Sequence, residues 1–190
     1  MFILEVFLVI FILLSLIIPG ATYNHYFNNS FSDKFNLLFG FILFLSFGTI
    51  LSIINIKIIS NQVIWFLSYL SLIIFSITYL SKKKIIMETL LSLLSINYLI
   101  FIMFFVLTTL IRFINPDIIH TEKIMEFMIL SSTMNGEGLI PKDLWFHNED
   151  ISYYSYGYFI FSSLPLIINL EPEIAYNFIL PIVVSLSYLA

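Results

Sequence analysis

The sequence predicts an all-α protein, a bundle of about six membrane-spanning helices with one short helix at the membrane surface in a long loop. Two observations lead to this fold class. Of the 190 residues, 60% are hydrophobic and 11% are charged, with a mean hydropathy of +1.02, whereas about a quarter of the residues in a soluble domain are charged. The apolar residues also form runs of roughly 20, the length a helix needs to cross a bilayer core of about 30 Å.

Composition also excludes several classes of function. The chain contains no cysteine, so it has neither disulfides nor thiolate metal sites. The net charge is -4 and no basic stripe is present, so we predict no nucleic-acid partner. The lipid bilayer is therefore the first partner that the sequence predicts.

Residues 1–112 are expected to hold four spans. The first, at residues 2–19, lacks the basic start and the small-residue cleavage site of a signal peptide, so we interpret it as a retained helix. A polar loop is expected at residues 20–34. The second, third and fourth spans are expected at residues 35–56, 63–80 and 85–111.

Residues 154–190 are expected to hold two more spans, at residues 154–170 and from residue 175 onward. Each contains a proline, Pro165 or Pro181, which membrane helices tolerate as a kink. The sixth span reaches Ala190 after about 24 Å of helix, and no basic or aromatic flank closes it. We therefore expect further spans, either from a longer chain or from a partner subunit.

The densest basic cluster, Lys82 to Lys84, lies in the short loop between the third and fourth spans. The positive-inside rule assigns such a cluster to the cytoplasm. The full count of Lys and Arg is even, because Lys34 and the three lysines give four on one side and four others lie on the other side. We therefore give the dense cluster more weight. The other four are Lys57, Arg112, Lys123 and Lys142. We predict a multi-pass protein of the cell membrane whose long loop, residues 113–153, is extracytoplasmic.

This long loop is the most polar part of the chain. Residues 122–132 within it predict a short helix that is too apolar to be free in solvent, so we expect it to pack on the membrane surface or on the spans. Only two lysines, Lys123 and Lys142, accompany the loop's carboxylates. The seven acidic residues are Asp117, Glu122, Glu126, Glu137, Asp143, Glu149 and Asp150.

Glu122 and Glu126 are four residues apart and therefore share one face of the predicted helix. Two carboxylates on an apolar helix repel each other unless they are solvated, paired with a cation, or bound to a metal or a protonated group. The pair is thus the best candidate site by physical argument. The alternative is a solvated face with Lys123 and Arg112 nearby.

A divalent metal is an alternative ligand of this region. His120 and His147, together with the two glutamates, supply ligand types, but no HExxH-type spacing supports such a site. The glycines at 136 and 138 predict a turn, and no Gly-Lys-Ser/Thr follows them, which excludes a phosphate-binding P-loop.

Aromatic residues follow in two groups. Trp145 and Phe146 come directly after Asp143 and Leu144, which suits a membrane-interface belt or, with the carboxylate, a platform for a sugar. A second group opens the fifth span and is denser than an ordinary belt, so some hydroxyls must face protein or a polar cavity. It comprises Tyr153, Tyr154, Tyr156 and Tyr158.

In this region the sequence resembles the YYY-domain family, archaeal and bacterial multi-pass membrane proteins with a domain of unknown function. The resemblance covers residues 115–190 and rests on motifs that occur in order with fitting spacing. These are Pro116-Asp117-Ile118, Thr121-Glu122-Lys123 with Met125, Pro141 with Asp143 and Trp145, Tyr153-Tyr154 with Gly157, and Ala175-Tyr176-Asn177. The chain departs from the family at Glu126, usually Asp, at Ser155, the third tyrosine, and at Ser152, commonly Asn.

The resemblance implies a layout like that of GT-C glycosyltransferases, with a polyprenyl-phosphate-linked sugar as donor. By this analogy Glu122 or Glu126 acts as a base toward an acceptor hydroxyl or coordinates a divalent metal. The candidate catalytic residues are Glu122, Glu126 and Asp143. The candidate substrate-binding residues are Lys123, Trp145, Tyr153, Tyr154, Tyr156 and Asn177.

Two other classes of function remain as alternatives. A transporter or channel component would carry its charges near mid-bilayer on broken helices, with Glu88, Glu122 and Glu126 along a polar path. The charged residues instead fall mainly outside the predicted spans, which favours an enzyme. A non-catalytic scaffold or an inactive fragment is the third alternative.

Overall fold

A computed structural model describes residues 2–27, 31–55, 59–118, 121–136, 138–145, 149–151 and 155–190; for Phe2, Thr121 and Glu122 it describes the backbone alone. Over these ranges the chain is helical, with a single isolated antiparallel bridge between Lys142 and Asp150. The α-helices are α1 (Phe2–Ser15), α2 (Ile17–Tyr26), α3 (Asn36–Ile54), α4 (Asn61–Lys83), α5 (Ile86–Ser92), α6 (Ile96–Ile114), α7 (Thr121–Met134), α8 (Ser155–Ile167) and α9 (Pro172–Leu189), and a 3₁₀ helix, η1 (Asp33–Phe35), precedes α3.

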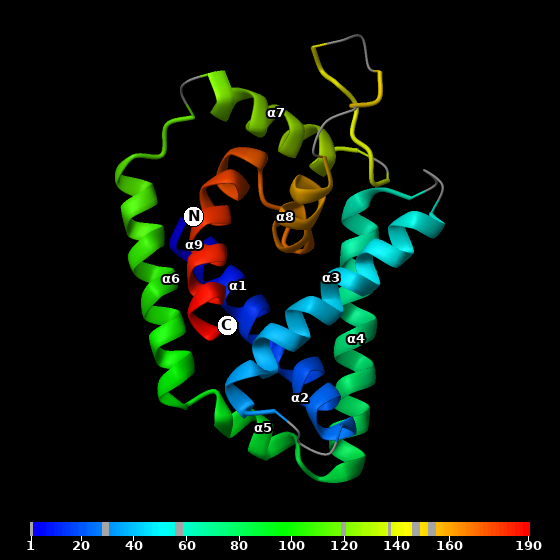
Figure 1. Cartoon of the computed structure of the whole chain (residues 1–190), viewed down its shortest axis with the longest axis vertical. Coiled ribbons are helices and arrows are strands. Elements are labelled where there is room, and N and C mark those ends of the chain that lie inside the picture. The colour runs from blue at the N-terminus through cyan, green and yellow to red at the C-terminus, as the bar shows by residue number, and fades with distance from the viewer. Residues whose placement is uncertain are drawn as a thin grey trace.

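The helices form one bundle, shown in Figure 1. The long helices α4 and α6 stand at opposite sides, α5 crosses one end and α7 crosses the other, while α1, α8 and α9 lie between them. The all-α class and the short helix in the long loop are therefore confirmed. Within the described residues, five helical segments are long and apolar enough to span a membrane: Ile3–Tyr26, Asp33–Ile54, Asn61–Lys83, Ile96–Ile114 and Pro172–Leu189.

The fifth predicted span is shorter than expected. In place of a helix over residues 154–170, α8 has 13 residues, about 20 Å of helix. It ends because Asn169 adopts a left-handed conformation (φ 55°), which lets the N–H of Leu170 donate to the carbonyl of Pro165. Sequence hydropathy does not detect this stop, because the immediate neighbours of Asn169, Ile168 and Leu170, are apolar.

The first predicted span is longer than expected, and the loop expected to start at residue 20 starts after α2. The helix is interrupted at Leu16, because Pro19 has no N–H to offer the carbonyl of Ser15. It then continues as α2, where Gly20 packs directly on the backbone of α3. The fourth predicted span is also divided, because Ser95 is extended (ψ 152°) and separates α5 from α6.

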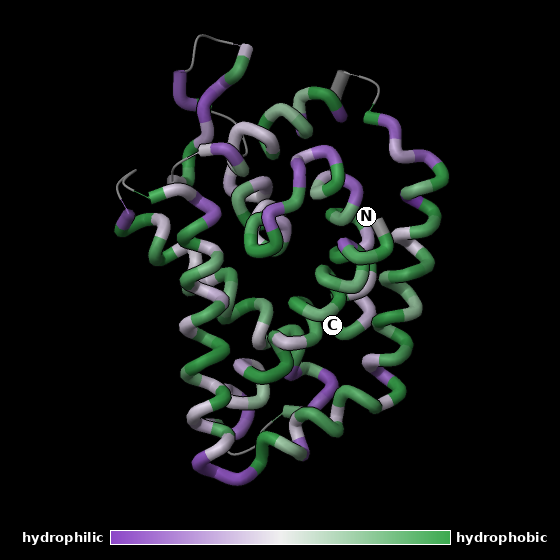
Figure 2. Tube along the Cα trace, turned by 180° about the vertical axis from the view of Figure 1, so that it is seen from behind, coloured by the Kyte–Doolittle hydropathy of each residue, from purple (hydrophilic) through white to green (hydrophobic). Residues whose placement is uncertain are grey.

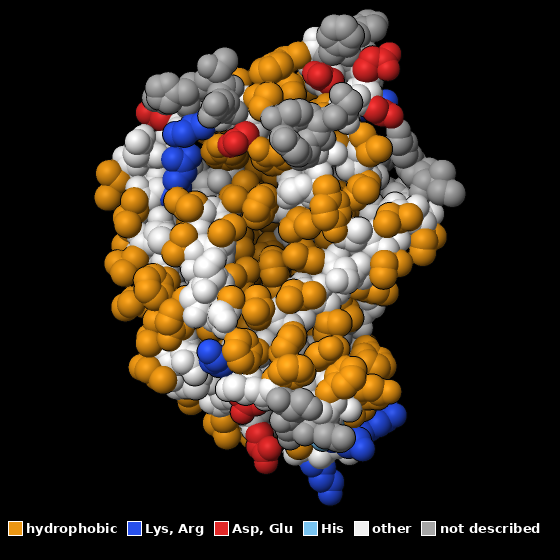
Figure 3. All heavy atoms as spheres, in the orientation of Figure 1, with side chains coloured by type: hydrophobic (Ala, Val, Ile, Leu, Met, Phe, Trp, Pro, Cys, Tyr) orange, Lys and Arg blue, Asp and Glu red, His pale blue; other side chains and the backbone are white. Residues whose placement is uncertain are grey.

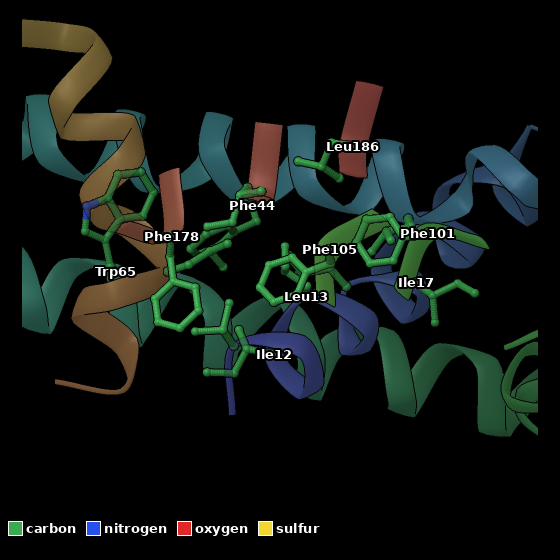
Figure 4. Close-up of a cluster of buried hydrophobic side chains, with 14 of the residues drawn as sticks. Ile12, Leu13, Ile17, Phe44, Trp65, Phe101, Phe105, Phe178 and Leu186 are labelled. Atoms are coloured by element: carbon green, nitrogen blue, oxygen red, sulfur yellow. The ribbon is translucent and has the colours of Figure 1, made fainter. Parts of the chain in front are cut away.

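The core runs along the middle of the bundle (Figure 4). Trp65 is fully buried and lies between the rings of Phe44 and Phe159, at centroid distances of 5.2 and 4.9 Å. Phe105 of α6 stacks on Phe178 of α9 at 6.1 Å. This stacked pair joins α6 and α9 and thereby fixes the rotation of α9 about its axis.

Polarity follows the long axis of the bundle. The hydrophilic parts of the backbone trace gather at the two ends, and the segments between them are hydrophobic (Figure 2). Most charged side chains on the face in Figure 3 likewise lie toward the two ends, with hydrophobic side chains between. The turn after α4, which holds the three lysines, is at the end opposite to α7 (Figure 1).

Asn61 connects the start of α4 to the segment that follows α7. Its side chain is fully buried, its amide donates to the carbonyls of Thr133 (2.8 Å) and Gly138 (2.9 Å), and its carbonyl accepts the N–H of Gly138 (2.9 Å). Gly138 has a φ of 90°, which favours glycine. One side chain therefore fixes the path of the loop.

Replacing Asn61 with leucine is expected to destabilise the protein by about 3 kcal/mol, because three hydrogen bonds are lost and buried backbone groups are left without partners. Thermal unfolding in detergent and protease cleavage after α7 measure the effect. Gln62→Leu is the control, since the Gln62 side chain makes an exposed bond to Asn169 and should change stability by less than about 0.5 kcal/mol. Equal behaviour of the two variants would contradict the assigned role of Asn61.

Candidate functional site

A pocket of about 510 Å³ lies between α6, α7, α8 and α9. Arg112, at the end of α6, and Lys123 and Glu126, in the first half of α7, form its charged part. The rest of the wall is mainly apolar and extends along α9, away from α7. The lining residues from α8 and α9 are Gly157, Tyr158, Phe161, Tyr176, Ile179, Leu180 and Val183.

Glu126 is held in place by α9. The hydroxyl of Tyr176 donates a hydrogen bond to Oε2 of Glu126 at 2.9 Å. The Tyr176 ring also meets Phe127 of α7 edge-on, with a centroid distance of 6.2 Å. Since the Phe105–Phe178 stack fixes the rotation of α9, Tyr176, two residues before Phe178, faces the carboxylate.

Arg112 supplies a positive charge at the same place. Its guanidinium carbon lies 5.7 Å from the centre of the Tyr176 ring, and its Nη1 donates to the carbonyl of Asn115 at 3.0 Å. An arginine in the last turn of a helix is also favoured by the helix dipole. Lys123 adds a second cation one helical turn before Glu126.

The pocket therefore joins a charged end, with two cations and one carboxylate, to an apolar wall. From Tyr176 to Val183 this wall runs along about 10 Å of helix. A ligand that fits both parts has an anionic head and a hydrocarbon tail, because the cations complement the head and the apolar wall complements the tail. A group that accepts a proton, Glu126, stands beside the head.

A divalent metal does not fit the described part of this pocket. Glu126 is the single carboxylate among its described lining residues, and the positive charges of Arg112 and Lys123 would repel a metal cation. Among the residues that the structure describes, no group of three or more His, Asp or Glu side chains is placed to hold a metal ion. We derive no step through a metal.

A family model described as "Uncharacterized membrane protein (DUF2298)" matches residues 38–190. The chain belongs to this family. The match includes the whole pocket and all the residues on which the resemblance to YYY-domain proteins rests. Membership agrees with the predicted domain of unknown function in a membrane protein. No curated protein and no solved structure matches the chain.

In this member of the DUF2298 family, the predicted site residues do not all come together. Glu126 and Lys123 line the pocket. Asp143 and Trp145 lie beyond the opposite end of α7, where the carboxylate of Asp143 accepts the N–H of Trp145 at 2.8 Å. These two residues and Glu126 therefore lie at opposite ends of α7.

Two other candidates are next in sequence to lining residues of the pocket, Gly157 and Tyr176, but do not line it. Tyr156 is half exposed, and its hydroxyl is 3.4 Å from Oγ1 of Thr49. Asn177 is buried and donates to the carbonyl of Glu173 at 2.9 Å, while its Oδ1 has no partner among the described residues. The side chain of Glu122 and the whole of Tyr153, Tyr154, His120 and His147 lie outside the described residues.

The sequence analysis missed Tyr176 and did not assign Arg112 or Tyr158 to a site. A signal for Tyr176 was available, because it is the central residue of the Ala175-Tyr176-Asn177 motif. Arg112 was named only as a cation near the two glutamates on a solvated face, since an arginine at the end of a span is usually an interfacial residue. The crossing of α6, α7 and α9 makes it part of the pocket.

Proposed function

We propose that this protein is a membrane glycosyltransferase of GT-C-like layout whose donor is a polyprenyl-phosphate-linked sugar, bound in the pocket between α6, α7, α8 and α9. One observation carries the proposal: two cations and a carboxylate stand at the head of a pocket whose remaining wall is apolar. A lipid-linked sugar phosphate has this same division into charged head and apolar tail. The DUF2298 membership supports a membrane protein and is neutral about the reaction.

The proposed reaction uses Glu126 and the two cations in different roles. Glu126 takes the proton of an acceptor hydroxyl, whose oxygen forms a bond to the anomeric carbon of the donor sugar. The bond from that carbon to the phosphate oxygen breaks, and its electron pair leaves with the lipid phosphate. Arg112 and Lys123 stabilise the charge that develops on this phosphate. Tyr176 acts as a positioning residue that orients the carboxylate.

The proposed location is the cell membrane, with α7 and the adjoining loop on the extracytoplasmic side. The three lysines after α4 support this orientation, since they are at the end opposite to α7. We also propose that a partner subunit supplies additional spans. Reporter fusions at the lysine turn and in the long loop test the orientation, and a long loop found in the cytoplasm would overturn it.

Removing both cations is expected to weaken the binding of a fluorescent polyprenyl phosphate roughly 100-fold, because each charge-assisted contact to a phosphate contributes about 1.5 kcal/mol. The test compares the Arg112→Gln/Lys123→Gln variant with the unmodified protein in nanodiscs. Lys83→Gln, an exposed lysine at the opposite end, is the matched control and should bind normally. The uncharged polyprenol of the same length should bind both proteins weakly and equally. Unchanged phosphate binding in the double variant would refute the donor site.

A further inference from the structure

A second hollow, of about 380 Å³, lies at the other end of α7 and has no part in the proposed donor site. We call it the loop groove. One side is formed by Ser131 and Ser132 in the last turns of α7 and by Asn135, which directly follows the helix. The other side is formed by Pro141, Lys142 and Leu144 of the segment that follows. Side chains from both the helix and the loop therefore shape the groove.

The loop side of the groove is a small antiparallel hairpin. The N–H of Asp143 donates to the carbonyl of Glu149 at 2.8 Å, and the N–H of Ile151 donates to the carbonyl of Pro141 at 3.1 Å. The hydroxyl of Ser132 donates to the carbonyl of Lys142 and joins the hairpin to α7. These bonds, with the Asn61 bonds to Gly138, attach the described part of the loop to α7 and to the start of α4.

The loop groove combines apolar and polar groups and carries little net charge. Lys142 is the single charged residue among its described lining residues, and its Nζ is paired with Oδ1 of Asp150 at 2.6 Å. Hydroxyl, amide and peptide groups alternate with the apolar side chains of Ile140 and Leu144. Such a surface suits a neutral ligand that combines hydroxyl groups with apolar faces, and it gives an ionic ligand no advantage.

Trp145 directly follows Leu144 of the groove. Its residue surface is 62% exposed, and its backbone is fixed by the Asp143 carboxylate. The second tryptophan, Trp65, is fully buried. An exposed indole next in the chain to a lining residue of the groove offers a flat apolar face on which a sugar ring can stack.

We infer that the loop groove binds a neutral carbohydrate, the acceptor glycan of the transfer, with Trp145 as a stacking platform. The inference rests on the proposed function and names its acceptor class. Asn135 directly follows α7 and is nine residues from Glu126, about 14 Å at the rise of a helix. A short oligosaccharide held in the groove can thus extend along α7 toward the carboxylate.

The test is acrylamide quenching of tryptophan fluorescence in nanodiscs, with short linear glucose and mannose oligosaccharides as probes. Because Trp65 is buried, the quenchable signal reports Trp145. We expect a saturable decrease in quenching as oligosaccharide is added. The Asn135→Leu variant should bind the sugar roughly tenfold more weakly, since it loses hydrogen-bonding capacity without loss of volume. Lys83→Gln is the control and should behave like the unmodified protein.

Three outcomes overturn the inference: no saturable change with any of the oligosaccharides, an equal change in the Asn135→Leu variant, or quenching of Trp145 by spin-labelled lipid, which would make it a membrane anchor. These outcomes leave the donor site intact, because polyprenyl phosphate binding depends on Arg112 and Lys123 at the other end of α7. Conversely, if the unmodified protein binds the oligosaccharide but not polyprenyl phosphate, the proposed function is rejected and the carbohydrate site remains.

Discussion

Replacing Gly40 with valine is expected to destabilise the protein by at least about 3 kcal/mol and to lower its melting temperature by roughly 10 °C. A Cβ atom at Gly40 would lie 1.7 Å from the carbonyl oxygen of Leu16, and one at Gly20 would lie 1.6 Å from that of Asn36. Both obstacles are backbone atoms, so no side chain can move aside. The helices α2 and α3 would have to separate.

The control is Gly157→Ala, because a Cβ atom at Gly157 has no heavy atom within 4 Å. This substitution lies in the helix α8 and should leave stability unchanged or raise it slightly. Unfolding is followed by the fluorescence of the buried Trp65 during heating in detergent. If Gly40→Val melts at the same temperature as the control, the close contact between α2 and α3 is incorrect.

The fold class was predictable because membrane helices are determined mainly by the length and composition of apolar runs. Their ends were harder to predict, because local hydrogen bonds decide them. Asn169 stops α8 in a left-handed conformation, and Lys84 does the same for α4 at φ 62°. Neither residue is glycine, the usual signal for such a stop. Gly20, interpreted as the start of a loop, is instead a contact point between two helices.

The candidate site was predictable in part. Glu126 and Lys123 stood out because charges on an apolar helix require partners. The partner of Glu126 is Tyr176 of α9, and Arg112 of α6 lies beside the Tyr176 ring, so both depend on how α6 and α9 pack. Asp143 was grouped with Glu126 by residue type, but α7 holds the two apart. The length of α7 thus separates Asp143 from Glu126, and the composition of the loop does not reveal this separation.

Replacing Glu126 with glutamine is expected to reduce sugar transfer by a factor of roughly 1,000, the usual range for loss of a general base. Glutamine has the same shape, and its amide oxygen can still accept the Tyr176 hydroxyl, so the pocket should keep its form. Transfer is measured in liposomes from a polyprenyl-phosphate-linked sugar to a soluble glycan. Binding of polyprenyl phosphate should change little, which separates a catalytic defect from a binding defect.

The choice between the two glutamates follows from a second variant. If Glu126 is the base, then Glu122→Gln alone keeps most of the activity, and the double variant is no worse than Glu126→Gln. Full transfer in the double variant would remove both carboxylates from the mechanism. Glu149→Gln, an exposed acid of the hairpin, serves as the control.

Tyr176→Phe isolates the positioning role, because it removes the bond to Glu126 and keeps the ring under Arg112. One lost hydrogen bond to a charged group should lower kcat about tenfold, with little change in KM for the lipid donor. A structural role for Tyr176 alone would instead lower stability and leave kcat unchanged. A drop in kcat with an unchanged melting temperature would therefore assign Tyr176 to the orientation of the base, although it lies 50 residues from Glu126 in the sequence.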